Sequence, residues 1–246
     1  KTTTHTVKKE WEDNDNKLGL RKAIKAQLKQ NGENYGEAIE LSEANNWEHT
    51  FKELPESNNG VDYKYTVEEL DIPEGYTHEV VTEGTNSVIT NRILSAIKQD
   101  LTFKKELEGR ELQEGEFSFH LLDENGNVVQ SAQNAADGTI TFKDVTFEKA
   151  GTYKFTVKEV SGDDAQITYD KSAKNVSVEV KQKGTEYVAT VTYDADTTFK
   201  NKYTAPAKPQ NDLPNTGTSS LVNTMLIATV LAMIALGFVY TSKKEN

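Results

Sequence analysis

Two segments of this 246-residue chain alternate like β-strands and carry a glutamate where the pattern calls for an apolar residue. In residues 153–160, three apolar side chains share a face with Glu159, because alternate side chains of a strand point to the same side. Residues 63–70 repeat the pattern, with Glu69 in the equivalent place. A buried carboxylate costs free energy unless it is paired or neutralised, so both glutamates are candidates for chemistry.

Each half of the chain also places a lysine and an asparagine on apolar faces of its first and last strand-like segments. In the first half, the alternation aligns Lys9 with the apolar residues of TVKKEW and Asn91 with the isoleucines of SVITNRI. In the second half, Lys105 follows the apolar face of LTFKKEL, and Asn201 lies between the aromatic residues of TFKNKY. Both halves therefore present a lysine, a glutamate and an asparagine in the same chain order.

These three side chains together can make an amide bond. Desolvation lowers the pKa of a lysine and raises the pKa of a glutamate, so a buried pair can be an uncharged amine and a carboxylic acid. The amine is then a nucleophile, while the acid can donate a hydrogen bond to the asparagine carbonyl and shuttle protons as ammonia leaves. The pattern predicts one Lys–Asn isopeptide bond in each half, with Glu69 and Glu159 as catalytic residues. The bond forms once, without turnover, and needs no cofactor.

A shift of strand phase by one residue would give a different set of buried charges. The inward residues would then be Lys8, Glu68, Lys104 or Lys158. A single charged residue in a strand, or just after one, is also common at a solvent-exposed edge. The alternation by itself therefore leaves both interpretations open.

Composition narrows the functional class. The net charge of −11 and the pI of about 5.0 argue against nucleic acid as a partner, because phosphate backbones repel an acidic surface. The absence of cysteine excludes disulfides and thiolate chemistry. No metal site is expected, since the acidic runs 12–16 and 123–127 lack the glycine and glutamate of a calcium loop. An enzyme is not predicted either, because the four histidines form no motif with serine and aspartate; they are His5, His49, His78 and His120.

The patterning predicts an all-β chain. Period-2 alternation and closely spaced turn signals indicate two tandem Ig-like β-sandwich domains, which we call the first module (residues 1–94) and the second module (residues 95–203). Each has about 100 residues, enough to bury its own core. Because the chain begins at Lys1 without a signal peptide, we expect it to be the C-terminal part of a longer or processed protein.

The C-terminal end carries a short motif, an apolar run and a basic tail in direct succession. A Pro-rich linker at 204–220 is followed by an uncharged run at 221–240, which is long enough to span a bilayer as a helix. The positively charged tail at 241–246 comes next and should stay in the cytoplasm. The linker contains the motif Leu213, Pro214, Asn215, Thr216 and Gly217. This arrangement resembles the LPxTG sorting signal of Gram-positive cell-wall proteins. The resemblance implies that a sortase cleaves after Thr216 and joins it to peptidoglycan or to another pilin subunit, so the chain is in the membrane only before sorting.

Both modules also resemble known families. Residues 4–93 are similar to a collagen-adhesin B-type (Cna B-type) repeat through KEWEDNDN, ANNWEHTFKELP, YKYTVEE and VITN, and YTVEELDIPEGY resembles the pilin E-box. Residues 100–203 resemble the streptococcal pilin isopeptide-linkage domain through LTFKKELEGRELQEGEFSF, GTYKFTVKE, ITYD and TFKNKY. Both families form Lys–Asn bonds with a glutamate helper. The resemblance therefore implies the triads Lys9–Glu69–Asn91 and Lys105–Glu159–Asn201.

The resemblance bears on two further expectations. Residues 18–32 combine helical spacing with a strand-like alternation, and we favour a strand chiefly because of the resemblance. The sequence departs from such repeats at residues 21–23, where a proline usually follows the arginine. The resemblance also implies a wall-anchored structural protein, either a pilin subunit or the stalk of an adhesin. The alternative is a module that binds a host matrix protein directly.

Overall fold

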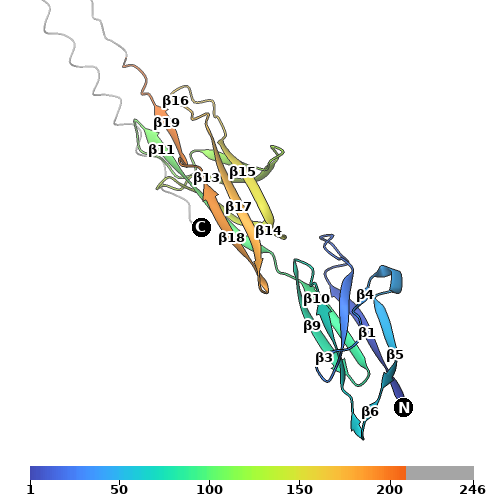
Figure 1. Cartoon of the computed structure of the whole chain (residues 1–246). Helices are drawn as coiled ribbons and strands as arrows, with labels where there is room; N and C mark the ends of the chain where they lie inside the picture. Colours follow the sequence, from blue (N-terminus) through green and yellow to red (C-terminus); the bar gives the residue numbers. More distant parts are fainter. Residues whose placement is uncertain (209–246) are drawn as a thin grey trace, which may run out of the picture. The chain divides into compact units, whose positions relative to one another are not determined.

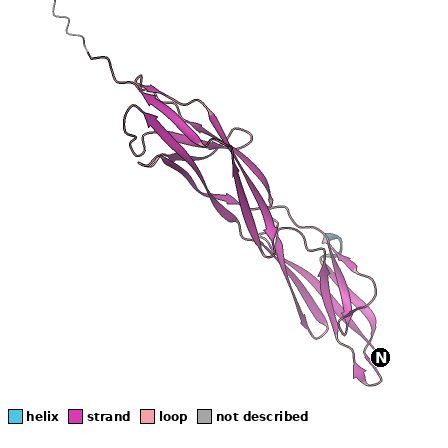
Figure 2. Ribbon diagram, turned by 60° about the vertical axis from the view of Figure 1, so that its left-hand side comes forward, coloured by secondary structure: helices cyan, strands magenta, loops and turns pink. Residues whose placement is uncertain are grey.

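The computed structural model describes residues 1–208, in which Lys1–Ala205 form one compact unit (Figure 1). The sorting motif at 213–217, the predicted membrane helix at 221–240 and the tail at 241–246 lie outside the described residues. Within residues 1–208, no helix has the length and apolar character needed to cross a membrane. The all-β prediction is confirmed, because the described residues are strands and loops apart from a short 3₁₀ helix, η1 (Glu43–Asn45) (Figure 2).

The first module is a sandwich of two four-stranded sheets. One sheet has the order β5-β1-β10-β9, and the other contains β3, β2 and β4 with β8 paired to β2. A small hairpin of β6 and β7 projects from the module. The strands of the first module are β1 (Thr2–Glu12), β2 (Ile24–Gln30), β3 (Glu33–Asn34), β4 (Ile39–Leu41), β5 (Glu48–Pro55), β6 (Ser57–Asn58), β7 (Val61–Asp62), β8 (Tyr65–Leu70), β9 (Tyr76–Glu83) and β10 (Asn86–Ile93).

Strand β2 settles the ambiguous segment 18–32. Ile24, Ala26 and Leu28 alternate inward and are almost fully buried, so the expected strand is confirmed for this part. Neighbouring strands hydrogen-bond to β2 on both edges, β8 on one and β4 with β3 on the other. Good helix formers therefore adopt β geometry here, because pairing on two edges and burial outweigh a weak intrinsic preference.

The second module is a sandwich of a four-stranded and a five-stranded sheet. Their strand orders are β14-β11-β19-β16 and β13-β12-β15-β17-β18. The core between them is rich in aromatic residues, including Phe103, Phe119 and Phe142. The strands are β11 (Ile97–Glu108), β12 (Ser118–Leu122), β13 (Val128–Gln133), β14 (Thr139–Phe147), β15 (Gly151–Glu159), β16 (Ile167–Thr168), β17 (Ala173–Lys183), β18 (Glu186–Tyr193) and β19 (Thr198–Tyr203).

The first and last strands of each module lie side by side and run parallel (Figure 1). In the first module, Lys9 of β1 pairs with Ile89 of β10, and Asn91 lies two residues further along. In the second module, Lys105 of β11 pairs with Phe199 of β19, and Asn201 again lies two residues further along. Side chains two apart in a strand share a face, so each lysine and its asparagine point into the same core.

The glutamates come from the other sheet. Glu69 lies on β8 and Glu159 ends β15, and each of these strands belongs to the sheet that faces the lysine and the asparagine across the core. Both modules therefore build their site in the same way, with two residues from one sheet and one from the opposing sheet.

Candidate isopeptide-forming sites

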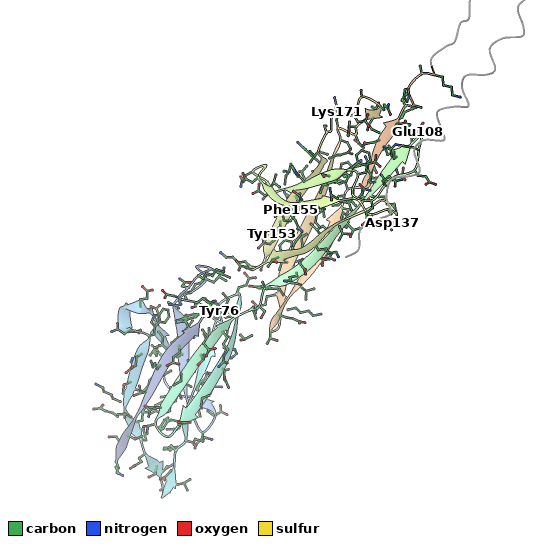
Figure 3. All side chains as sticks on the ribbon, turned by 180° about the vertical axis from the view of Figure 1, so that it is seen from behind. Tyr76, Glu108, Asp137, Tyr153, Phe155 and Lys171 are labelled. Carbon is green, nitrogen blue, oxygen red and sulfur yellow. The ribbon has the colours of Figure 1, made fainter. Side chains whose placement is uncertain are left out.

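In the second module, Glu159 contacts both of its predicted partners. Lys105 Nζ donates to Glu159 Oε2 at 2.6 Å, and Asn201 Nδ2 donates to Glu159 Oε1 at 2.5 Å. The Lys105 and Glu159 side chains are completely shielded from solvent, and Asn201 is 2% exposed. One carboxyl group thus bridges an amine and a primary amide in a dry site. Figure 3 labels Tyr153 and Phe155, which precede Glu159 on the same strand.

Aromatic rings and a glycine fix the position of Lys105. Its Nζ lies 4.5 Å from the ring centroid of Phe117 and 5.9 Å from that of Phe119. Its backbone N–H donates to the carbonyl of Gly138 at 2.7 Å. Gly138 has a φ of +83°, and a Cβ there would lie 2.2 Å from the Lys105 carbonyl oxygen, so only glycine fits.

In the first module, the same three residue types are buried together. Lys9, Glu69 and Asn91 are 3%, 5% and 0% exposed, and Asn91 Nδ2 donates to Glu69 Oε1 at 2.8 Å. Lys9 Nζ donates to the carbonyl of Glu10 at 2.7 Å and lies 3.9 Å from the centroid of the Trp11 ring. The amine therefore sits under the indole, and no hydrogen bond joins it to Glu69 among the described residues.

Two buried oxygen atoms of the first site have no hydrogen-bond partner within residues 1–208, namely Glu69 Oε2 and Asn91 Oδ1. An unsatisfied buried acceptor is costly. A primary amide has nearly the same shape in both orientations, so its oxygen can also face Glu69. If Glu69 carries a proton, it then donates to the Asn91 carbonyl, as expected for an acid that polarises this group.

Burial sets the protonation of both sites. Desolvation lowers the pKa of Lys9 to about 8, and it lowers the pKa of Lys105 as well. Desolvation raises the pKa of Glu69 and of Glu159. These opposite shifts reduce the free-energy gap between the ion pair and the uncharged pair of an amine and a carboxylic acid.

The four residues of the alternative strand phase point to solvent. Lys8, Glu68, Lys104 and Lys158 are all exposed, whereas their neighbours Lys9, Glu69, Lys105 and Glu159 have buried side chains. Lys104, for example, donates to the exposed carbonyl of Asp137 at 2.7 Å. The structure therefore brings together the predicted site residues and places the phase-shifted set outside.

A second buried charge network flanks the first site and was not expected from the sequence. Asp13 is 1% exposed and accepts hydrogen bonds from Nε and Nη2 of Arg21, at 2.7 and 2.5 Å, and from the Tyr76 hydroxyl at 2.8 Å. The hydrogen bonds from Arg21 hold the pKa of Asp13 at about 2. The Tyr76 ring packs edge-on against Trp11, which covers Lys9. The sequence analysis singled out residues 21–23 only for the missing proline and assigned Arg21 no role.

Family models match the chain in three consecutive blocks. Residues 5–92 match the Cna protein B-type domain, residues 101–204 match the Spy0128-like isopeptide containing domain, and residues 205–246 match the LPXTG cell wall anchor motif.

Individual proteins also resemble the chain. A collagen adhesin of Staphylococcus aureus is 31% identical over 202 residues, which cover 79% of this chain and 17% of the length of that relative. Among solved structures, two B repeat units of the collagen binding protein of Staphylococcus aureus align at 24% identity and a TM-score of 0.45, over 82% of this chain and 76% of theirs. The C-terminal fragment of the pilus adhesin SpaC from Lactobacillus rhamnosus GG aligns at 12% identity and a TM-score of 0.42, over 84% of this chain and 100% of that fragment.

The chain is a surface protein anchored to the Gram-positive cell wall through a sortase signal. Its two modules match a Cna protein B-type domain followed by a Spy0128-like isopeptide containing domain. The relatives reported above are named as adhesins, not as enzymes. The expected class of protein, the two β-sandwich modules and the cell-wall location are confirmed, whereas the predicted membrane helix at 221–240 lies outside the described residues.

Proposed function

We propose that each module closes one intramolecular Lys–Asn isopeptide bond and that the chain thereby serves as a covalently braced stalk segment. The observation that carries this proposal is the contact of one shielded carboxyl group, Glu159, with both Lys105 and Asn201. The first module supports it with the buried set Lys9, Glu69 and Asn91.

The proposed reaction exchanges one amide nitrogen for another. The uncharged lysine Nζ attacks the asparagine Cγ, and a new C–N bond forms as the bond from Cγ to Nδ2 breaks. The attacking amine loses one proton, which the glutamate passes to Nδ2, and ammonia leaves. The glutamate ends in its starting protonation state. Glu69 serves in this way between Lys9 and Asn91, and Glu159 serves between Lys105 and Asn201.

The position of the bonds suits a protein that carries tension. Each bond joins the first strand of a module to its last strand, β1 to β10 and β11 to β19. Force that enters one terminus of a module and leaves at the other is then borne by covalent bonds, so the strands between them carry little load. We further propose that Thr216 is the residue through which a sortase joins the chain to peptidoglycan or to another pilin subunit.

Intact-mass measurement tests the proposal. Residues 1–212 should fall short of the sequence mass by two molecules of ammonia, one for each module. Glu69→Ala and Glu159→Ala should each restore one ammonia, because each removes one proton shuttle. The matched controls Glu68→Ala and Lys158→Ala change exposed neighbours on the same strands and should keep the full shortfall. A folded sample with the complete sequence mass would falsify the proposal.

A second candidate function is direct binding of a host matrix protein. It is favoured by the similarity to a relative named collagen adhesin, although this chain spans only 17% of that protein. Binding of residues 1–212 to immobilised collagen, compared with binding to an uncoated surface, tests this candidate. Saturable binding supports it, and equal signals on both surfaces leave the stalk as the function of this chain.

A further inference from the structure

The amide oxygen of Asn201 already has a hydrogen-bond donor in the second site. The backbone N–H of Asp170 donates to Asn201 Oδ1 at 2.7 Å. On the other side of the same amide, Nδ2 donates to Glu159 Oε1. The Asn201 amide is therefore held in one orientation, with its oxygen on a backbone N–H and its nitrogen on the carboxyl group.

The Asp170 side chain holds this N–H in place. Its Oδ2 accepts the backbone N–H of Lys200 at 2.8 Å, and its Oδ1 accepts the backbone N–H of Ser172 at 2.8 Å. Lys200 immediately precedes Asn201 on β19, so the carboxylate ties the segment after β16 to the strand that carries the reacting amide. The bond from Lys200 thus fixes the donor relative to its acceptor, and the bond from Ser172 holds the turn that carries it.

This arrangement matters for the proposed reaction because the carbonyl oxygen gains negative charge when an amine attacks its carbon. A donor that already points at this oxygen stabilises the charge without reorganisation, as in an oxyanion hole. The first site differs, because Asn91 Oδ1 has no hydrogen-bond partner within residues 1–208. We propose that the Asp170 N–H is the oxyanion donor of the second site and that Glu159 acts there only as the proton relay. This inference rests on the proposed isopeptide chemistry.

The roles of the two groups then separate along the reaction. Lys105 Nζ attacks Cγ of Asn201, and the electron pair of the C=O bond moves onto Oδ1, where the Asp170 N–H stabilises it. The proton from Nζ passes to Glu159 Oε2, and Oε1 delivers a proton to Nδ2. Collapse of the intermediate restores the C=O bond, breaks the bond from Cγ to Nδ2 and releases ammonia. No further reactant is required.

Replacing one backbone amide with an ester tests the donor directly. The full chain is made by cell-free synthesis in detergent micelles with the α-hydroxy analogue of aspartate at position 170, which deletes the N–H and keeps the side chain. The matched control places an ester at Gln166, whose N–H donates to Asp164 Oδ1 at 2.8 Å in an exposed loop of the same module. Samples are quenched over time, digested, and scored for the cross-linked peptide pair of each module.

We expect the ester at position 170 to slow the Lys105–Asn201 bond by about 10²-fold, the usual effect of losing one oxyanion donor. The Gln166 ester should leave the rate within about twofold of wild type, and the Lys9–Asn91 bond should form at the same rate in every chain. A wild-type rate for the position 170 ester would overturn the inference while the proposed function stands. Absence of both cross-linked pairs from the wild-type chain would instead overturn the proposed function, and this inference with it.

Side-chain variants keep the test decisive if the ester disturbs folding. Asp170→Asn retains an acceptor oxygen for one of the two backbone N–H groups, whereas Asp170→Ala retains none. Resistance of the second module to limited proteolysis shows that each variant is folded. Among folded variants, the rate of the Lys105–Asn201 bond should fall in the order wild type, Asn, Ala. A wild-type rate in folded Asp170→Ala would contradict the inference.

Discussion

Replacing Lys105 with methionine should separate the contribution of the covalent bond from that of the folded sandwich. Methionine is similar in length to lysine and has no amine, so it fills the site and cannot form the bond. Lys105 and Asn201 enclose 96 residues (201 − 105). For a covalent loop of this size, the chain-entropy model gives a stabilisation of ~4–5 kcal/mol through restriction of the unfolded state. Loss of the amine also leaves the buried Glu159 carboxyl with Asn201 as its remaining partner in the site, which adds to the destabilisation.

The expected loss translates into a large change in the melting temperature. A domain of about 100 residues shifts by at least 4 °C for each kcal/mol, so the second module of Lys105→Met should melt roughly 20 °C lower than wild type. Differential scanning calorimetry measures this shift, and intact mass shows that the variant has gained one ammonia. The transition of the first module should not move, because its own bond remains.

Lys104→Met is the matched control for this experiment. Lys104 is the preceding residue of β11, is exposed, and contacts only a backbone carbonyl through its amine. The control should keep both missing ammonias and melt within about 2 °C of wild type, as surface substitutions usually do. A Lys105→Met protein that gains one ammonia yet melts with wild type would refute the loop-closure argument. One that still lacks two ammonias would show that Lys105 is not the nucleophile.

Three further outcomes concern the first module. The rate of Lys9–Asn91 bond formation should be highest at pH values between the raised pKa of Glu69 and the pKa of Lys9, about 8, because the reacting pair must share one proton. A rate of cross-linked peptide formation that keeps rising from pH 8 to 10 would contradict this. His5 is buried, and desolvation lowers its pKa below 6.5. The first module should therefore lose stability as the pH falls from 6.5 through the lower pKa of the folded state. His5→Gln should flatten this dependence of the melting temperature on pH in thermal scans. Arg21→Met strands the buried carboxylate of Asp13 and should cost about 3–5 kcal/mol in urea unfolding, so an unchanged midpoint would show that the pair is dispensable.

The relative speed of the two sites is a fourth outcome. The Lys105–Asn201 bond should appear before the Lys9–Asn91 bond in newly made protein, because only the second site has a preformed donor on the amide oxygen. Time-resolved peptide mapping of wild-type chain measures both rates in one sample.

Strand alternation reduced the possible buried charges to two sets, one for each strand phase. Period-2 spacing fixes the face of each residue once one apolar neighbour is assigned inward, and this places Lys9, Glu69, Lys105 and Glu159 on buried faces. The same reasoning could not exclude a phase shift, because a charged residue on either face satisfies a short pattern. Packing decides the phase, since a shifted β11 would turn Leu101 and Phe103, which are almost fully buried, towards solvent.

The contacts between strands were beyond the sequence pattern. Each asparagine lies two residues beyond the residue that pairs with its lysine. This spacing is set by the parallel register of β1 with β10 and of β11 with β19. Residues far apart in the chain determine that register together, so no local pattern reveals it. The Asp13–Arg21 pair was missed for a related reason, because charged residues in a loop give no periodic signal. Asp170 was included in the ITYD segment that carries the family resemblance, but a backbone N–H has no sequence signature of its own.

Under the proposed function, the two sites share one register but reach the same bond by two different routes. Both modules hold lysine and asparagine on parallel neighbours and supply the acid from the opposing sheet. In the second module, the segment after β16 brings a backbone donor to the amide oxygen, so Glu159 needs only to move protons. In the first module, that oxygen has no donor within residues 1–208, so Glu69 must both polarise the carbonyl and relay the proton. Glu69→Ala should therefore form no first bond even after long incubation, whereas Glu159→Ala should lack the second bond when newly made and gain it only slowly through the oxyanion donor.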